Sequence, residues 1–251
     1  MGAPGCDDAP VVDVSLGSVR KPVQMVRAYY QNPETLKAHM LGFGDLSHEL
    51  RRQVSAIFVD DGSPTGQAEF VLRKLPLPVP TRLFRMDVDI RWNWLGARNV
   101  GMHHATDGWC LITDMDHFAD AALLETLVYG DHDPDIIYRF SRREHTGQEA
   151  HPHPNSWFMT REMYWKIGGH DESLSGHYGT DGEYRRRCVA TAPIRIMSTP
   201  LIRRERVGDS STTRYDRKQP EDRRVAKIVA ARGRKWSPRI LSFPYHEVVL
   251  P

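Results

Sequence analysis

Residues 54–64 read VSAIFVDDGSP, and this stretch decides the fold class. A short run of apolar and β-branched residues that ends in Asp, Gly, Ser and Pro predicts a buried strand leading into a polar turn. The pattern recurs at residues 108–117, which read GWCLITDMDH. Ligands of parallel α/β sheets bind beyond the carboxyl ends of the strands, so both acidic turns are candidates for a site.

Similar apolar runs alternate with segments of helical periodicity on either side of these turns. We expect strands at residues 23–30, 54–59, 82–88, 109–112, 135–140 and 156–159, and helices from residue 33 and at 97–105, 119–129 and 161–167. Residues 141–155 are polar and rich in His and Pro, which is typical of a surface loop. The alternation predicts an α/β fold with a mainly parallel sheet flanked by helices.

The composition is that of a globular protein. The 251 residues include 34 Lys and Arg, 32 Asp and Glu and 40% hydrophobic residues, which excludes disordered and fibrous classes. No apolar run approaches the ~20 residues that span a bilayer, and the first residues do not form a secretory signal. Three scattered cysteines form neither a disulfide framework nor a zinc motif. We expect a soluble, cytoplasmic protein, compatible with a bacterial or viral origin.

Positive charge is concentrated near the C-terminus. Residues 203–239 hold 13 Lys and Arg and 5 Asp and Glu, a local charge of +8. One interpretation is a solvated helix face with loops, and the other is an anion site for a nucleotide diphosphate or a nucleic acid. Tyr215 and Trp236 lie in this segment as aromatic groups able to stack on bases.

The second acidic turn suggests a metal site. Asp114 and Asp116 are two residues apart, so in extended chain they point to the same side. Carboxylates in this arrangement suit a hard cation such as Mg²⁺ or Mn²⁺. The alternative is that Asp and Gly only terminate the strand, as they often do.

Two further motifs begin with glycine. Residues 96–101 read GARNVG and place Arg98 and Asn99 in the first turn of a helix. One interpretation is a binding site for a phosphate at the helix N-terminus, and the other is an ordinary helix start. Residues 168–172 read GGHDE, and Asp181 opens a later charged helix. Asp181 is suited to take a proton from an attacking hydroxyl, or else only stabilises the helix dipole.

In this order, the motifs resemble those of GT-A fold glycosyltransferases, most closely family 2 with a galactosyltransferase-like C-terminal half. The resemblance covers residues 22–200 and rests on five segments: residues 59–63, 96–101, 114–116, 168–172 and 179–181. It implies a lead-in at 1–21, a glycosyltransferase domain at 22–200 and an irregular basic extension at 201–251. The domain would have a nucleotide-binding half at about 22–118 and an acceptor half at about 119–200.

The resemblance also implies roles for single residues. Asp60 and Asp61 would contact the nucleotide of a nucleotide-sugar donor. Arg98 and Asn99 would lie close to it. Asp114 and Asp116 would hold Mn²⁺ or Mg²⁺ at the diphosphate, with Asp114 also contacting the donor. The general base would be Asp181, and the acceptor site would include Thr180, Trp157 and His177.

Two departures from the family pattern affect these roles. Thr180 stands where members often carry Glu, so one acceptor contact is in doubt. Residues 201–204 read LIRR where a metal-binding His is expected, and we expect Arg203 or Arg204 to bind the diphosphate. His117 or His177 would then supply the third metal ligand.

The sequence thus predicts an inverting glycosyltransferase that moves a sugar from a UDP-sugar, or another nucleoside-diphosphate sugar, to a hydroxyl acceptor. Acceptor classes left open are a polysaccharide, a protein and a hydroxymethylated DNA base. One alternative is an inactive sugar-nucleotide or glycan-binding module. The other is a metal-dependent nucleotidyltransferase, which would more usually carry a Gly-rich phosphate loop where residues 29–33 read YYQNP.

Overall fold

The computed structural model describes residues 9–204, 221–232 and 236–251. Its strands are β1 (Val11–Val12), β2 (Val23–Tyr29), β3 (Val54–Asp60), β4 (Thr81–Met86), β5 (Trp109–Thr113), β6 (His117–Phe118), β7 (Ile137–Glu144), β8 (Glu149–Ala150), β9 (Trp157–Thr160), β10 (Ile194–Arg203) and β11 (Tyr245–Val248). Its helices are α1 (Pro33–Gly44), α2 (His48–Arg51), α3 (Ala68–Leu72), α4 (Trp94–His104), α5 (Ala121–Tyr129), α6 (Arg161–Ile167), the 3₁₀ turn η2 (Glu172–Leu174), α7 (Asp181–Thr191) and α8 (Glu221–Ala230).

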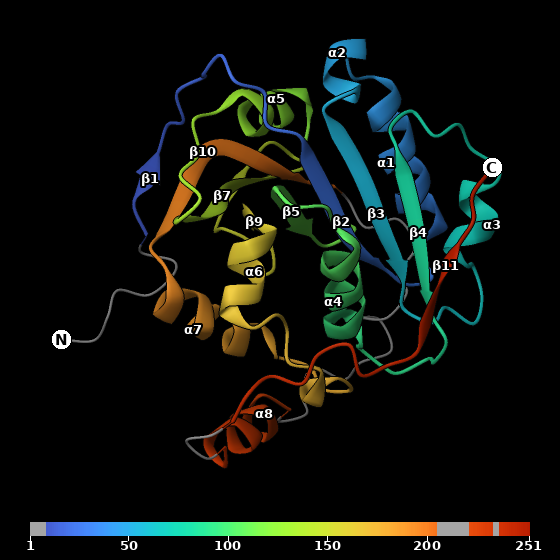
Figure 1. The fold of residues 1–251 in the computed structure, drawn as a ribbon, viewed down its shortest axis with the longest axis vertical. Helices are drawn as coiled ribbons and strands as arrows, with labels where there is room; N and C mark the ends of the chain where they lie inside the picture. Colours follow the sequence, from blue (N-terminus) through green and yellow to red (C-terminus); the bar gives the residue numbers. More distant parts are fainter. Residues whose placement is uncertain (1–8, 205–220, 233–235) are drawn as a thin grey trace.

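Across the described residues, all strands belong to one twisted sheet (Figure 1). The order is β1-β10-β7-β9-β5-β2-β3-β4-β11, with β6 paired to β10 and β8 to β7. Strands β5, β2, β3 and β4 are mutually parallel, and β7 is parallel to β10. Strand β9 runs antiparallel to both β5 and β7 and joins the two parallel halves. The carboxyl ends of β3, β5, β7 and β10 therefore lie along one edge.

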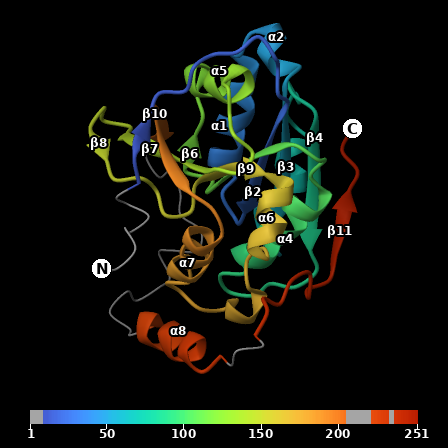
Figure 2. The same ribbon diagram turned by 60° about the vertical axis from the view of Figure 1, so that its left-hand side comes forward.

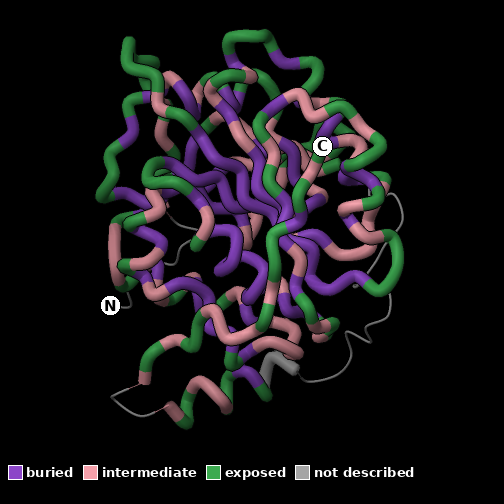
Figure 3. Tube along the Cα trace, turned by 45° about the vertical axis from the view of Figure 1, so that its right-hand side comes forward, coloured by how far each residue is buried: buried purple, intermediate pink, exposed green. Residues whose placement is uncertain are grey.

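Helices cover both faces of the sheet (Figure 2). The apolar side chains of α1, α2, α3 and α5 pack on one face, and those of α4, α6 and α7 pack on the other. The central strands are buried along nearly their whole length (Figure 3). The predicted α/β fold with a mainly parallel sheet is confirmed.

Local sequence explains two junctions close to the site edge. Asn32, which directly precedes Pro33, caps α1 as expected, since its side chain accepts a hydrogen bond from the Thr35 amide. Gly62 follows β3 with a φ of +70°, and a Cβ there would lie 2.1 Å from the Val88 carbonyl oxygen. Only glycine allows the turn after Asp61 to pass this close to the neighbouring loop.

The structure differs from the sequence-based expectations in several elements. Helix α4 begins at Trp94 rather than residue 97, and residues 141–155 are only partly a loop, because β7 continues to Glu144 and pairs with β8. Residue 201 lies inside β10, and the chain returns as β11 to pair with β4. The described part of the extension from residue 201 is thus partly regular, because it forms the end of β10 and adds β11 as a terminal strand beside β4.

Arg27 lies in the middle of this core. It belongs to β2, flanked in register by Phe58 and Thr113, and its side chain is fully buried. None of its three guanidinium nitrogens has a hydrogen-bond partner among the described residues. Burial lowers the pKa of Arg27 to about 9, so the group remains charged at neutral pH. An unpaired buried charge destabilises a fold.

We expect Arg27→Met to raise the free energy of unfolding at pH 7 by about 1–4 kcal/mol. Burial lowers the folded-state pKa to about 9, far below the ordinary value of an arginine in the unfolded chain, so the penalty is complete below pH 9 and is relieved as pH rises above it. Urea unfolding of both proteins should therefore show a difference in the free energy of unfolding that is smaller at pH 10 than at pH 7. A less stable Arg27→Met protein would contradict this and indicate a stabilising anion on Arg27.

Candidate active site

The predicted acidic turns meet at one edge of the sheet. Asp60 ends β3, and Asp114 and Asp116 follow β5. Strand β6, which begins at His117, pairs antiparallel with the end of β10, so that His117 lies opposite Arg203. The sheet topology therefore brings Arg203 to the second acidic turn, across 86 residues of sequence.

Each of the two carboxylates after β5 contacts one arginine and one histidine. Arg98 donates from Nη2 to Oδ1 of Asp114, and His153 Nε2 lies 3.5 Å from Oδ2. Asp116 Oδ1 lies 2.7 Å from His117 Nδ1, and its Oδ2 lies 3.6 Å from Arg203 Nε. Two negative charges are thus balanced by two guanidinium groups within the protein.

Burial governs the ionisation of this cluster. It raises the pKa of Asp114, against the opposing effect of Arg98. Burial also lowers the pKa of His153 well below its ordinary value, and the neighbouring His117 lowers it further. The two imidazole rings lie with their centroids 3.9 Å apart, and Nε2 of His117 has no hydrogen-bond partner among the described residues.

His153 is the site residue that the sequence analysis missed. It lies in the polar segment that was expected to be a surface loop, and the only local signal was the HPHP run at residues 151–154. The buried guanidinium of Arg139 donates to the carbonyl oxygens of Pro152 and His153, at 3.1 and 3.2 Å. This contact holds the loop against β7 and directs His153 to Asp114.

The first acidic turn contains two different carboxylates. Asp60 accepts hydrogen bonds from the Ser63 and Ala68 amides and lies 3.4 Å from Arg85. Asp61 is buried, and its Oδ1 has no hydrogen-bond partner among the described residues. Burial raises the pKa of Asp61 well above its ordinary value, and the charges of Asp60 and Asp89 add to the effect. Asp61 is therefore the carboxyl with unused hydrogen-bonding capacity.

Arg98 and Asn99 are both fully buried on α4 but serve different contacts. Arg98 Nη2 donates to Asp114, while its Nε and Nη1 have no hydrogen-bond partner among the described residues. Asn99 donates to the His170 carbonyl and to Glu172, and it accepts from the Tyr164 hydroxyl and the His170 amide. Its amide group is fully used inside the protein, so a donor contact would require these bonds to break.

The residues predicted for catalysis and acceptor binding lie on three elements. Asp181 opens α7, half-buried, and its charge acts on the Asp114 carboxyl. Thr180 precedes it, with a buried hydroxyl that has no described hydrogen-bond partner, and His177 is half-buried in the same loop. Trp157 is fully buried in β9, so an acceptor contact by its ring would require the core to open. These roles stay predictions.

The donor atoms at the second acidic turn suit a divalent cation, since carboxylates and imidazoles are both present. Throughout the described ranges, however, no three His, Cys, Asp or Glu side chains are arranged to hold a metal. Arg98 and Arg203 already contact the two carboxylates. A cation bound at Asp116 would thus take much of its coordination from ligand oxygens.

Much of the basic segment, including Tyr215, lies outside the described residues. Three of its described arginines contact the protein itself: Arg203 pairs with Asp116, Arg204 lies over the Phe118 ring, and Arg232 lies 4.0 Å from the Trp236 ring centre. Nucleic-acid binding by this segment stays a prediction. Among the described residues, no helix is long and apolar enough to cross a membrane.

The model of the family described as glycosyl transferase family 2 matches residues 46–196, more than half of the chain. The chain therefore belongs to glycosyl transferase family 2, and the resemblance drawn from the motifs is confirmed. No curated protein matches it.

Solved structures of glycosyltransferases share the fold. TarS (residues 1–349) of S. aureus with UDP-GlcNAc has a TM-score of 0.64 at 13% identity, covering 83% of this chain and 65% of its own. The mannosyltransferase PcManGT of Pyrobaculum calidifontis with GDP-Man and Mn²⁺ gives 0.56 at 16% identity, covering 78% and 60%. GalNAc-T7 with UDP, GalNAc and Mn²⁺ gives 0.58 at 12% identity, covering 84% and 48%. The fold is GT-A, and this chain spans less than two thirds of each relative.

We expect Asp61→Asn to raise the free energy of unfolding at pH 8 by ~1 kcal/mol, because asparagine keeps the shape but not the buried charge. The raised pKa means that the folded protein holds this proton better than the unfolded chain, so stability is lost as pH rises above the ordinary carboxyl range. Urea unfolding at pH 5 and pH 8 measures this. The prediction would be contradicted if Asp61→Asn lost as much stability between pH 5 and pH 8 as the unaltered protein does.

Proposed function

We propose that the chain transfers a sugar from a nucleoside-diphosphate sugar to a hydroxyl acceptor, with inversion at the anomeric carbon. One observation carries the proposal: the carboxylates of Asp114 and Asp116, paired with Arg98 and Arg203, follow β5, and the charge of Asp181 acts on the Asp114 carboxyl. This arrangement supports the proposal that a diphosphate-binding group and the base act at the same edge of the sheet. Family membership supports the same reaction class.

The donor would occupy the edge between β3 and β5. Asp61, with its unused Oδ1, would accept a hydrogen bond from the nucleotide. Arg98 would turn one of its unused nitrogens to a phosphate oxygen, and Arg203 and Arg204 would approach the diphosphate from β10. The nucleotide is proposed to be UDP, since the TarS and GalNAc-T7 structures contain UDP or a UDP-sugar.

Asp181 would act as the base. It takes the proton of the acceptor hydroxyl while the hydroxyl oxygen bonds to the anomeric carbon. The bond from that carbon to the diphosphate oxygen breaks, and the diphosphate leaves with the electron pair. Attack from the side opposite the leaving group inverts the configuration. Thr180 and His177 precede Asp181 in the loop before α7 and would contact the acceptor.

A divalent cation would be held by Asp116, with Asp114 and His117 beside it. When bound, it would neutralise part of the negative charge of the leaving diphosphate. The donor atoms at this turn support it, because the carboxylates of Asp114 and Asp116 and the imidazole of His117 suit a hard divalent cation. The relatives PcManGT and GalNAc-T7 contain Mn²⁺ in their structures.

We expect Asp181→Asn to lower kcat for transfer by about 10²- to 10⁴-fold, because the amide cannot take the acceptor proton. Donor affinity should stay within about twofold, since the side chain serves the acceptor. Turnover on a panel of polysaccharide, protein and hydroxymethylated DNA acceptors measures this. Undiminished transfer by Asp181→Asn would overturn the assignment of the base.

We expect UDP to bind more tightly with Mn²⁺ than without it, and Asp116→Ala to remove that difference, because the carboxylate proposed to hold the cation is lost. Calorimetry with UDP, GDP and CDP, each with and without Mn²⁺, measures this. Thr126→Ala, far from this edge on α5, serves as the control. Binding of no nucleotide would contradict the proposal, and pyrophosphate release from a nucleoside triphosphate would favour a nucleotidyltransferase.

A further inference from the structure

The chain beyond the family match returns to the site edge. The match ends at residue 196, whereas α8 and residues 236–248 follow it. Val225 of α8 packs in a small apolar cluster with Leu95 of α4 and Leu174 of η2. Figures 1 and 2 both show α8 below α4 and α7, at the end of the molecule where α7 begins.

Two acidic residues of the GGHDE motif bind this returning segment. Asp171 Oδ1 accepts from the Arg239 amide at 3.0 Å, and the Glu172 amide donates to the Arg239 carbonyl at 2.8 Å. The Glu172 carboxylate accepts from the Leu241 and Ser242 amides, each at 2.7 Å. In this structure the motif therefore anchors the C-terminal segment, and Glu172 also binds Asn99 of α4.

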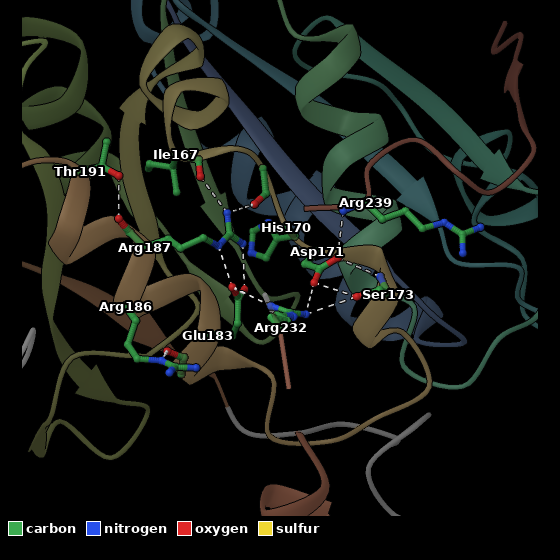
Figure 4. Close-up of polar contacts among 12 residues, drawn as sticks. Ile167, His170, Asp171, Ser173, Glu183, Arg186, Arg187, Thr191, Arg232 and Arg239 are labelled. Carbon is green, nitrogen blue, oxygen red and sulfur yellow. Dashed lines mark hydrogen bonds and ion pairs between the residues drawn. The ribbon is translucent and has the colours of Figure 1, made fainter. Parts of the chain in front are cut away.

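Arg232 lies at the centre of these contacts with a side chain only 10% exposed. Its Nη2 pairs with Asp171 Oδ2, and its Nη1 lies 3.3 Å from Glu183 Oε1 (Figure 4). The guanidinium also lies 4.0 Å from the ring centre of Trp236. One buried cation thus joins the η2 turn to the first turn of α7.

Glu183 is fixed from a second side. Arg187 binds it through two hydrogen bonds of 2.8 and 2.9 Å, and Arg187 Nη1 also donates to the carbonyls of Ile167 and Gly169. The first turn of α7 is therefore tied to both α6 and η2. The loop before it contains Gly176 and Gly179, both at positive φ. Glycine restricts the backbone less than any other residue, so this loop does not fix α7 strongly. The ion pairs of Glu183 with Arg187 and Arg232 therefore fix the position of the first turn of α7, which the preceding loop does not fix by itself.

We propose that Arg232 is a positioning residue that holds the first turn of α7 so that Asp181 faces the Asp114 and Asp116 carboxylates. Asp181 lies two residues before Glu183, so a shift of the Glu183 turn moves the base. The catalytic part of this inference rests on the proposed function. The structural part, a latch supplied by chain outside the family match, does not.

The experiment measures amide hydrogen exchange, nucleotide affinity and transfer for Arg232→Met. Without the cation, Asp171 and Glu183 each lose a buried partner, so exchange at residues 180–186 should become about tenfold faster or more. Exchange in β2 and β3 should not change. Transfer kcat should fall about tenfold or more, while the Kd for UDP with Mn²⁺ stays within about twofold.

The controls separate the latch from general loss of stability. Arg239→Met removes one positive charge from the same segment, but the Arg239 side chain points away from the cluster, so exchange at residues 180–186 should not change (Figure 4). Arg232→Lys keeps one charge and should restore part of both exchange protection and kcat. If Arg232→Met does not fold, Trp236→Leu, which leaves both ion pairs in place, should loosen residues 180–186 to a smaller extent.

Three results would overturn the proposal. Unchanged exchange at residues 180–186 in folded Arg232→Met would exclude the latch, and equally faster exchange throughout the sheet would reduce Arg232 to a general stabiliser. Local loosening with unchanged kcat would exclude the positioning of Asp181. If the unaltered protein transfers no sugar to any acceptor, the proposed function fails, while the exchange measurement still decides the latch.

Discussion

The balance of charge at the end of β5 is the constraint on which the site depends. Asp114 and Asp116 are half-buried negative side chains, and each is compensated by one guanidinium group. Arg98 comes from α4 on one face, and Arg203 comes from β10 across the sheet. Because unpaired carboxylates there would be costly, the same contacts that stabilise the edge also bring positive charge to where a diphosphate would bind.

The outer segments of the chain complete what the family-matched region begins. Strand β10 ends at Arg203 beside β6, and β11 pairs with β4 as the outermost strand on the other side of the sheet. Between them, Arg232 connects Asp171 to Glu183 at the start of α7. The candidate active site is therefore built by residues from both inside and outside residues 46–196.

Much of the fold could be predicted because its signals are local. The apolar runs of β2, β3 and β5 and the Asn32–Pro33 cap of α1 each lie within a few residues, so periodicity and turn chemistry reveal them. Strand β10 was missed because Pro200 and alternating polar residues weaken its pattern; it forms because β7 pairs with it. His153 was missed for a similar reason, since Arg139 rather than local sequence directs its loop.

The sequence by itself determined the chemical groups: two acidic turns after apolar strands, an arginine at the start of a helix and an acidic helix start. Only the tertiary structure decided which of these groups meet. Arg203 reaches Asp116 because β6 and β10 pair. The amide nitrogen of Asn99 donates both of its hydrogen bonds to His170 and Glu172 because α4 packs against their turn. Contacts between distant residues depend on strand order and helix packing, which no local pattern encodes.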